Sequence, residues 1–226
     1  MWNRTELKLK GRKAFRSNYW PSVLVGFLLA LTSGSMVTTA SMSQQSGDQT
    51  GYSLYQLPPG LAAFIASFAV VLLVAGLAIS IFVFGPLQVG CSRFFLVNAL
   101  QKADLKELGV PFNRSYINTV KVMFFTGLFE ALWTLLFIIP GIIKMYAWRF
   151  VPYILAEKPD IDQKEARELS AAMMNGHKWN AFLYDLSFIG WYFLGGLTLG
   201  LVNLFYTHPY KGASDAELYL AIRTQS

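Results

Sequence analysis

Long apolar stretches alternate with short charged ones along the chain, and several approach the roughly 20 residues that a membrane-crossing helix needs. The pattern predicts an all-α fold, a polytopic helical membrane protein with about six transmembrane helices in three hairpins. Amphipathic helices are expected on the cytoplasmic side. We expect a single transmembrane domain over residues 1–226, with spans at 20–38, 61–85, 118–139, 141–157, 181–194 and 196–209.

The connections between these spans differ in polarity. They are a basic leader (1–19), an outside loop (39–60), a cytoplasmic amphipathic region (87–117), a cytoplasmic amphipathic helix (160–179) and a cytoplasmic tail (210–226). The outside loop is rich in Ser, Thr, Gln and Gly and has no Lys or Arg. The helix at 160–179 is expected to begin with a capping box of Asp162 and Glu165 and to end at Gly176.

The distribution of basic residues predicts the orientation. Apart from Lys144 and Arg149, the 19 Lys and Arg residues fall in the leader, between Arg93 and Lys121, between Lys158 and Lys178, or in the tail. Basic residues stay on the cytoplasmic side of membrane spans, so both termini are expected there. The same rule accounts for the net charge of +6, and nucleic-acid binding is therefore not expected.

Two points of this topology stay open. A five-span model places the tail from Thr207 outside instead of inside. The first span is short and is followed by small residues at Thr38–Ala40, so a cleaved signal peptide is the alternative to a retained anchor. The long basic leader favours retention.

A weak internal repeat favours six spans over five. Three apolar helices each end at a proline followed by an amphipathic stretch, at Pro86, Pro152 and Pro209. The first two prolines each follow a predicted two-helix hairpin. The third apolar block is therefore also expected to be a hairpin, with its turn near Gly195 and Gly196.

Composition excludes several classes of protein. Apolar residues make up 54% of the chain and charged residues only 14%, whereas about a quarter of an ordinary soluble domain is charged. The single cysteine, Cys91, excludes an internal disulfide and a cysteine-based metal cluster, and we expect a buried thiol. No phosphate-binding loop, nucleophile elbow or zinc-protease motif is present, so no cofactor, metal or catalytic residue is predicted.

Ionisable side chains at membrane depth are the strongest candidates for a functional site, because each costs about 2.5 to 3.5 kcal/mol at the bilayer centre. If the chain reverses at Pro140 and Gly141, Glu130 and Arg149 lie at similar depths, which predicts an ion pair. That pair would either fix helix register or mark a path for a proton or substrate.

Two further groups of residues are candidates. Asp185, near the cytoplasmic end of the fifth span, forms a possible polar site with His177 and Lys178. Gly196 and Gly200 form a G-x-x-x-G pattern that permits close helix packing, within the chain or between two copies.

Three segments carry a resemblance to a known family: PGIIKMYAWRFVPYILAEKP, ELSAAMMNGHKW and LSFIGWYFLGGLTLGLVNLFYTHPY. Together with the basic leader and first hairpin, they resemble the bacterial integral membrane family catalogued as domain of unknown function nine-seventy-five. The resemblance implies a multi-pass protein of the bacterial cell membrane, without an established activity or active site.

The leading hypothesis is an integral membrane protein that is not an enzyme and acts through membrane lipids, protein partners or self-association. The alternative is a small transporter or channel subunit that uses Glu130, Arg149 and Asp185. A lipid-active enzyme around Asp185, His177 and Lys178 is a weaker third reading.

Overall fold

The computed structural model describes residues 2–32, 58–113 and 115–224, and these residues fold into helices with no strand. The all-α prediction is confirmed for them. Most of the predicted outside loop and the proposed cleavage site lie outside the described residues. The elements are α1 (Arg4–Ser17), α2 (Tyr19–Thr32), α4 (Pro59–Ile79), η2 (Ser80–Phe84), α5 (Gly85–Leu100), η3 (Leu105–Gly109), α6 (Val110–Asn113), α7 (Tyr116–Leu136), α8 (Ile138–Trp148), α9 (Val151–Glu157), α10 (Gln163–Met173), α11 (Lys178–Leu186), α12 (Ile189–Leu197), η4 (Asn203–Thr207) and α13 (His208–Arg223).

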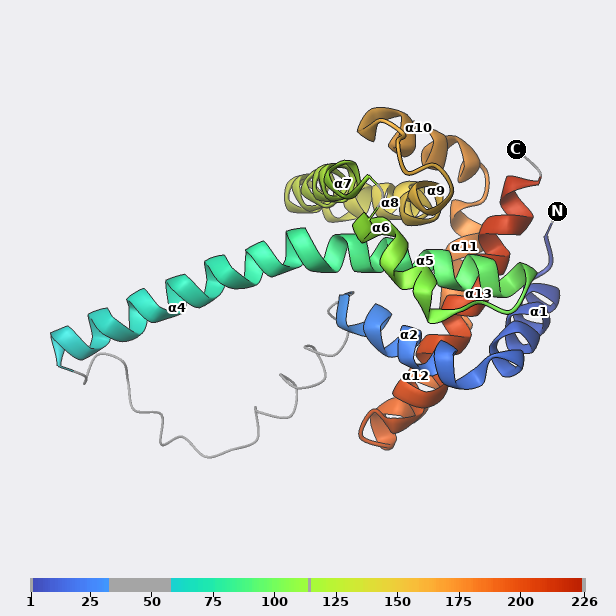
Figure 1. Cartoon of the computed structure of the whole chain (residues 1–226), viewed down its shortest axis with the longest axis horizontal. Coiled ribbons are helices and arrows are strands. Elements are labelled where there is room, and N and C mark those ends of the chain that lie inside the picture. Colours follow the sequence, from blue (N-terminus) through green and yellow to red (C-terminus); the bar gives the residue numbers. More distant parts are fainter. Residues whose placement is uncertain (1, 33–57, 114, 225–226) are drawn as a thin grey trace.

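The helices α4 and α5 form one continuous rod through the short π-helix η2, and α4 projects far from the rest of the fold (Figure 1). The sequence repeat predicted that an apolar helix ends at Pro86, and this is wrong. Proline lacks the N–H that would bind the carbonyl of Phe82, four residues earlier. The hydroxyl of Tyr116 on α7 donates to that carbonyl instead, at 2.7 Å, so the rod continues without leaving the oxygen unpaired.

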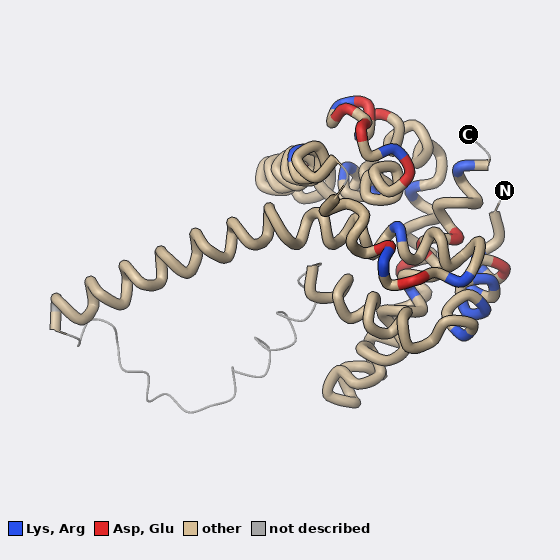
Figure 2. Tube along the Cα trace, in the orientation of Figure 1, with Lys and Arg blue, Asp and Glu red and all other residues tan. Residues whose placement is uncertain are grey.

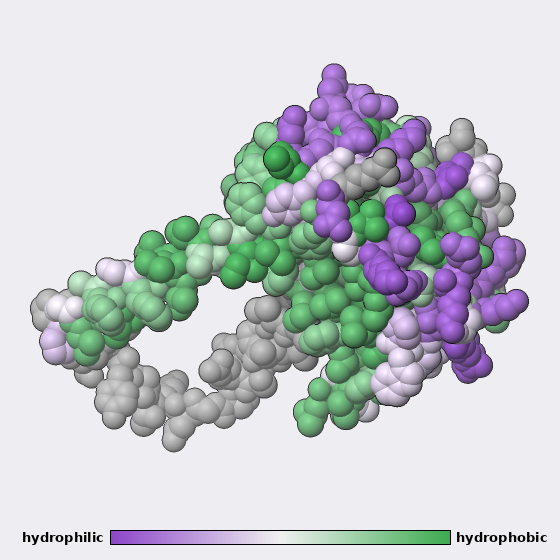
Figure 3. Space-filling view, viewed as in Figure 1, coloured by the Kyte–Doolittle hydropathy of each residue, from purple (hydrophilic) through white to green (hydrophobic). Residues whose placement is uncertain are grey.

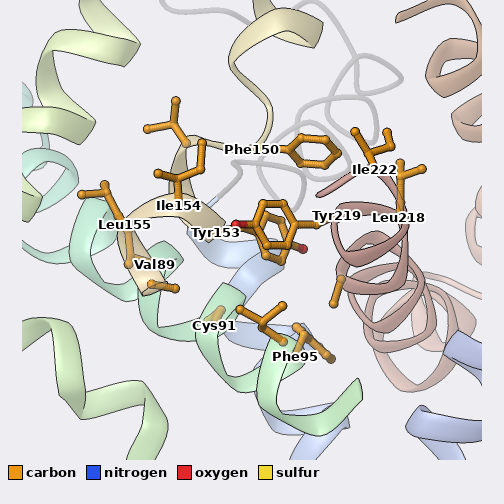
Figure 4. Packing of buried hydrophobic residues seen from close by; sticks show 14 of the residues in the cluster. Val89, Cys91, Phe95, Phe150, Tyr153, Ile154, Leu155, Leu218, Tyr219 and Ile222 are labelled. Atoms are coloured by element: carbon orange, nitrogen blue, oxygen red, sulfur yellow. The ribbon is translucent and has the colours of Figure 1, made fainter. Parts of the chain in front are cut away.

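Three helices that carry a proline in their first turn form the buried core: α5, α9 and α13. They start at the three prolines of the sequence repeat, and α5 packs against both α9 and α13. Figure 4 shows their side chains meeting, with the rings of Tyr153 and Tyr219 stacked at 5.2 Å.

These three helices follow the prolines as the repeat indicates, but they are not amphipathic helices on the membrane surface. In α5, Val89, Cys91, Phe94 and Phe95 are buried, because neighbouring helices cover the apolar side chains on several of its faces. The expectation that residues 87–117 begin with a surface helix is therefore wrong for α5. The expectation that Cys91 is buried is confirmed.

Charged and apolar residues separate into two parts of the molecule. Lys, Arg, Asp and Glu gather around the core helices, α1, η3 and α10, and α4 carries none (Figure 2). We call this part the charged half. The apolar projections are α4, the α7–α8 turn (residues 135–139) and the α12–η4 turn (residues 197–201), and Figure 3 shows the hydrophobic surface extending away from the charged half.

The two turns reverse the chain where apolar residues are most exposed. The α7–α8 hairpin reverses at Phe137, not at Pro140, and the backbone of Gly141 then packs closely against Thr134. In the other turn, Leu199 is 95% exposed, and both Leu199 and Gly200 have positive φ angles, of 51° and 86°. The third apolar block is thus a short hairpin as expected, although its turn lies at 198–200.

Among the described residues, two helices are long and apolar enough to cross a membrane: the rod over Gly60–Leu100 and α7 over Tyr116–Leu136. The helix α2 is apolar but has only 14 residues. At about 1.5 Å per residue, the 11 residues of α8 extend about 16 Å, which is about half of the hydrocarbon core. The count of six crossings is not shown.

The two ends of the described chain lie side by side, because α1 packs against α13 (Figure 1). At the junction of α1 and α2, the buried amide of Asn18 donates to Asn98 on α5 at 3.0 Å. The helix α10 begins at the predicted N-cap Asp162, but no hydrogen bond of the Glu165 side chain completes the box among the described residues, and the helix ends at Met173, three residues before Gly176. The Asp162 carboxylate accepts the backbone N–H of Lys164, and this hydrogen bond lowers the pKa of the carboxyl.

Candidate functional site

Arg149 lies at the interruption between α8 and α9, where the helical path turns. Ser170 on α10 stabilises this interruption through two hydrogen bonds. Its hydroxyl donates to the carbonyl of Ala147 at 2.8 Å and accepts the N–H of Phe150 at 3.2 Å. At this break in the helix, the Arg149 side chain reaches α11 and α13, where its partners lie.

The guanidinium of Arg149 binds two carboxylates from different helices. It donates to both oxygens of Asp185 on α11, at 2.8 and 3.1 Å, and to Asp215 on α13 at 2.8 Å. Lys211 on α13 binds the same two carboxylates, each at 2.9 Å. The hydroxyl of Tyr146 also donates to Asp185, at 3.0 Å. We call Tyr146, Arg149, Asp185, Lys211 and Asp215 the charge cluster.

The charge cluster is electrically balanced, since two cations face two carboxylates. Its charged side chains are between 14% and 26% exposed, so the ion pairs form at partly buried positions where screening by water is reduced. Bidentate contacts between Arg149 and Asp185 also fix their relative orientation. The cluster therefore connects α8, α11 and α13 at the edge of the core.

A cavity of about 890 Å³ adjoins the cluster. Its walls are the junction of α4 with α5, the inner face of α7 and the end of α8. Arg149, Asp185, Lys211 and Asp215 form the charged end, and Leu77, Ile81 and Leu128 are among the apolar lining residues. The cavity thus joins a charged wall to apolar helices that project from the fold.

Glu130 lines this cavity, but the expected ion pair with Arg149 does not form within the described residues. The turn at Phe137 explains the difference. Glu130 lies seven residues before Phe137 and Arg149 twelve after it, so at about 1.5 Å per residue their depths differ by about 7.5 Å. Arg149 therefore reaches the charged half, while Glu130 remains nearer to the turn.

His177 and Lys178 are not brought together with Asp185. The Nδ1 atom of His177 accepts the indole N–H of Trp2 at 3.3 Å, which joins the start of α11 to the N-terminal segment. For the described part of the chain, no hydrogen bond or ion pair joins His177 or Lys178 to Asp185. The aspartate belongs to the charge cluster instead, because it lies two turns further along α11.

Within the described chain, Gly196 and Gly200 do not form a helix-packing face. A Cβ atom at Gly196 would meet nothing within 4 Å, and Gly200 lies beyond the end of α12 in the turn. The reversal at 198–200 separates the two glycines. The close approach is made by Gly195, where a Cβ atom would overlap the side chain of Asn203.

The cluster contains two residues that the sequence reading assigned to a cytoplasmic tail, Lys211 and Asp215. Their spacing of four residues places them on one helix face, as the structure confirms with an ion pair at 2.9 Å. That local signal was available in the sequence. Their pairing with Arg149 and Asp185 depends on the contact of α13 with the rest of the fold and has no local signal.

The geometry limits the chemistry of this site. Both carboxylates of the cluster already accept several hydrogen bonds from cations, so neither is a free general base. Across residues 2–32, 58–113 and 115–224, no group of three or more His, Cys, Asp or Glu is arranged to hold a metal ion. The arrangement instead combines a wall of charged side chains with no net charge, one additional carboxylate at Glu130 and an apolar cavity lining.

A family model described as "Protein of unknown function (DUF975)" matches residues 62–226. The match covers α4 from its fourth residue onward, both hairpins and all members of the charge cluster. No curated protein and no solved structure matches the chain.

Proposed function

The chain belongs to the DUF975 family of proteins of unknown function, and from this premise we propose that it is a multi-pass integral membrane protein of the bacterial cell membrane that is not an enzyme. It acts through membrane lipids, protein partners or a second copy of itself. The observation that carries the proposal is the separation of the apolar projections from the charged half (Figures 2 and 3).

Exposure of α4 supports insertion into lipid. Every residue from Ala63 to Ser80 is exposed, and the most apolar window of the rod has a mean hydropathy of 2.7 with none of it buried. Contact with water would cost about 25 cal/mol for each Å² of this apolar surface. The 21 residues of α4 extend about 32 Å, close to the thickness of the hydrocarbon core.

The positions of the charges support the orientation. The basic helix α1 packs against α13, so both ends of the described chain belong to the charged half. Basic residues are retained on the cytoplasmic face. We therefore assign the charged half, with both termini, to the cytoplasmic side, and α4 and the two turns to the bilayer.

Site-directed labelling of cysteines tests this arrangement in cells. In a Cys91→Ser background, a cysteine at Lys164 on α10 should react with a membrane-impermeant maleimide only after the cells are permeabilised. A cysteine at Leu199, in the apolar α12–η4 turn, should remain unlabelled in both conditions and react only in denaturant. Labelling at Lys164 in intact cells would contradict the orientation.

Membrane residence is measured separately. The wild-type protein should remain in the membrane pellet after washing at alkaline pH and enter the supernatant only with detergent. Release by the alkaline wash alone would overturn the proposal, whatever the labelling pattern.

A small transporter or channel subunit is the second candidate, and one observation favours it. Glu130, Arg149 and Asp185 line the same cavity, although Arg149 and Asp185 neutralise each other. Flux of an ion or solute through proteoliposomes that falls when Glu130 is changed to Gln would favour this candidate. Unchanged flux in that variant would remove it.

A further inference from the structure

We propose that the cavity binds a lipophilic organic cation, with the positive charge of the ligand beside the carboxylate of Glu130. The inference rests on the proposed insertion of the apolar projections into a membrane. It assigns a ligand class to a cavity whose charged wall is already internally paired.

The first observation is the unpaired state of Glu130. No hydrogen bond or ion pair involves its carboxylate within the described chain, although three cations lie on neighbouring elements. Arg149 is bound by the charge cluster. Lys144 lies over the rings of Trp133 and Trp148, each at 5.4 Å, and Arg167 lies over Phe129 at 4.8 Å. The described residues therefore supply no counter-ion to Glu130.

The second observation is the charge balance of the cavity. The two cations and two carboxylates of the cluster cancel, and Glu130 adds one negative charge to the lining. An anionic ligand would meet this uncompensated carboxylate and would have to displace Asp185 or Asp215 from Arg149 and Lys211. A cation meets a complementary charge without breaking an existing ion pair. The balance thus favours a cationic ligand over an anionic one.

The third observation is the apolar and aromatic character of the rest of the lining. Phe84, Phe124, Tyr146 and Trp148 are among the lining residues, and aromatic faces attract organic cations. A volume of about 890 Å³ lies within the usual range for small-molecule sites. A small hydrated metal ion would leave most of this apolar surface uncovered, whereas a bulky cation would cover it.

The route to the cavity also suits a lipophilic ligand. Leu77, Ser80 and Ile81 line the cavity at the end of α4 that joins the core. In the proposed orientation, this end of α4 lies in the bilayer near its cytoplasmic face. A ligand that partitions into the membrane would be concentrated at this position.

Equilibrium binding to the full-length protein tests the proposal. The protein is placed in nanodiscs of zwitterionic phosphatidylcholine, and empty nanodiscs measure partitioning into lipid. The probe is radiolabelled tetraphenylphosphonium, and its comparison is tetraphenylborate, which has the same four rings and the opposite charge. Saturable binding above the empty nanodiscs is expected for the cation alone.

Two matched variants separate charge from folding. Glu130→Gln should weaken binding of the cation at least tenfold, while Glu165→Gln, which removes a carboxylate from the exposed face of α10, should leave it unchanged. Gly127→Leu provides a second variant that keeps the charge. Its side chain has space, since a Cβ atom there meets nothing within 4 Å, and Gly127 lines the cavity, so the added volume should also weaken binding.

Three results would overturn the proposal: no saturable binding of the cation, equal binding of the borate, or full affinity for the cation in a folded Glu130→Gln variant. If Glu130→Gln does not fold, two measurements decide the outcome: the comparison of the two probes on the wild type, and binding of the cation to the Gly127→Leu variant. The alkaline wash decides membrane residence independently, so failure of the site and failure of the proposed function are distinguishable.

Discussion

The two ends of the α4–α5 rod have the same secondary structure and opposite surroundings. In α4, every residue from Ala63 to Ile79 is exposed, although the segment is almost entirely apolar. In α5, which carries Gln88, Arg93 and Asn98, most residues are buried against other helices. The more polar half of the rod is thus the buried half.

This contrast separates two causes of helix stability. The helix α5 is held by side-chain packing and by polar contacts such as the 2.6 Å ion pair of Arg93 with Glu107. Among the described residues, α4 has no such contacts with other helices along Ala63–Ile79, so its apolar surface is left uncovered. Hydropathy therefore identifies the segment that meets lipid in the proposed arrangement, and it says little about which helices form the protein core.

The strongest test of the contrast truncates one phenylalanine in α4 and one in α5. Phe95 on α5 is 1% exposed and Phe68 on α4 is 57% exposed. Phe95→Ala should reduce the free energy of unfolding in detergent micelles by about 3 to 5 kcal/mol, because it leaves a cavity in the core. Phe68→Ala should change it by about 0.5 kcal/mol or less, as for other exposed positions. Equal losses would show that α4 is packed in the folded protein.

A charge placed in each half gives the next largest effect. Leu73 on α4 is 62% exposed and Leu100 at the end of α5 is 72% exposed. Leu73→Lys should raise the free energy of insertion into liposomes by about 2.5 to 3.5 kcal/mol, because the charge enters hydrocarbon. Leu100→Lys should leave it unchanged. The measurement is the fraction of full-length protein that urea extracts, and equal extraction of both variants would contradict the assignment of α4 to lipid.

Double-mutant cycles at the cavity, where the charged half meets the apolar projections, give the smallest effect. Arg149→Gln and Asp185→Asn should show a coupling free energy of about 0.5 to 3 kcal/mol, since the two groups share hydrogen bonds. Glu130→Gln combined with Arg149→Gln should be additive, because these residues form no pair. Denaturation in micelles measures both cycles. Strong coupling in the second cycle would restore the ion pair that the sequence suggested.

Local signals in the sequence predicted local structure well. The cap at Asp162 and the reversal within the last apolar block each follow from residues within a few positions of one another. Helix caps and turns depend on residues close together in the chain, so a single sequence is enough to predict them. The all-α class follows for the same reason.

Partners distant in the sequence could not be predicted in the same way. Arg149 pairs with Asp215, 66 residues later, because α13 packs beside the break between α8 and α9. The depth of Arg149 relative to Glu130 also depended on the exact position of the turn, and a shift of three residues, from Pro140 to Phe137, was enough to separate them. The residues of the candidate site were thus partly recognisable, but their partners were not.

The hydrogen bond from Tyr116 to the carbonyl of Phe82 has a mechanical consequence. It pairs the carbonyl that Pro86 leaves without an N–H donor, and α4 and α5 stay joined as one continuous helix. A change in bilayer thickness tilts a long apolar helix. In the proposed arrangement, such a tilt of α4 would also tilt α5, which packs against α9 and α13 in the core.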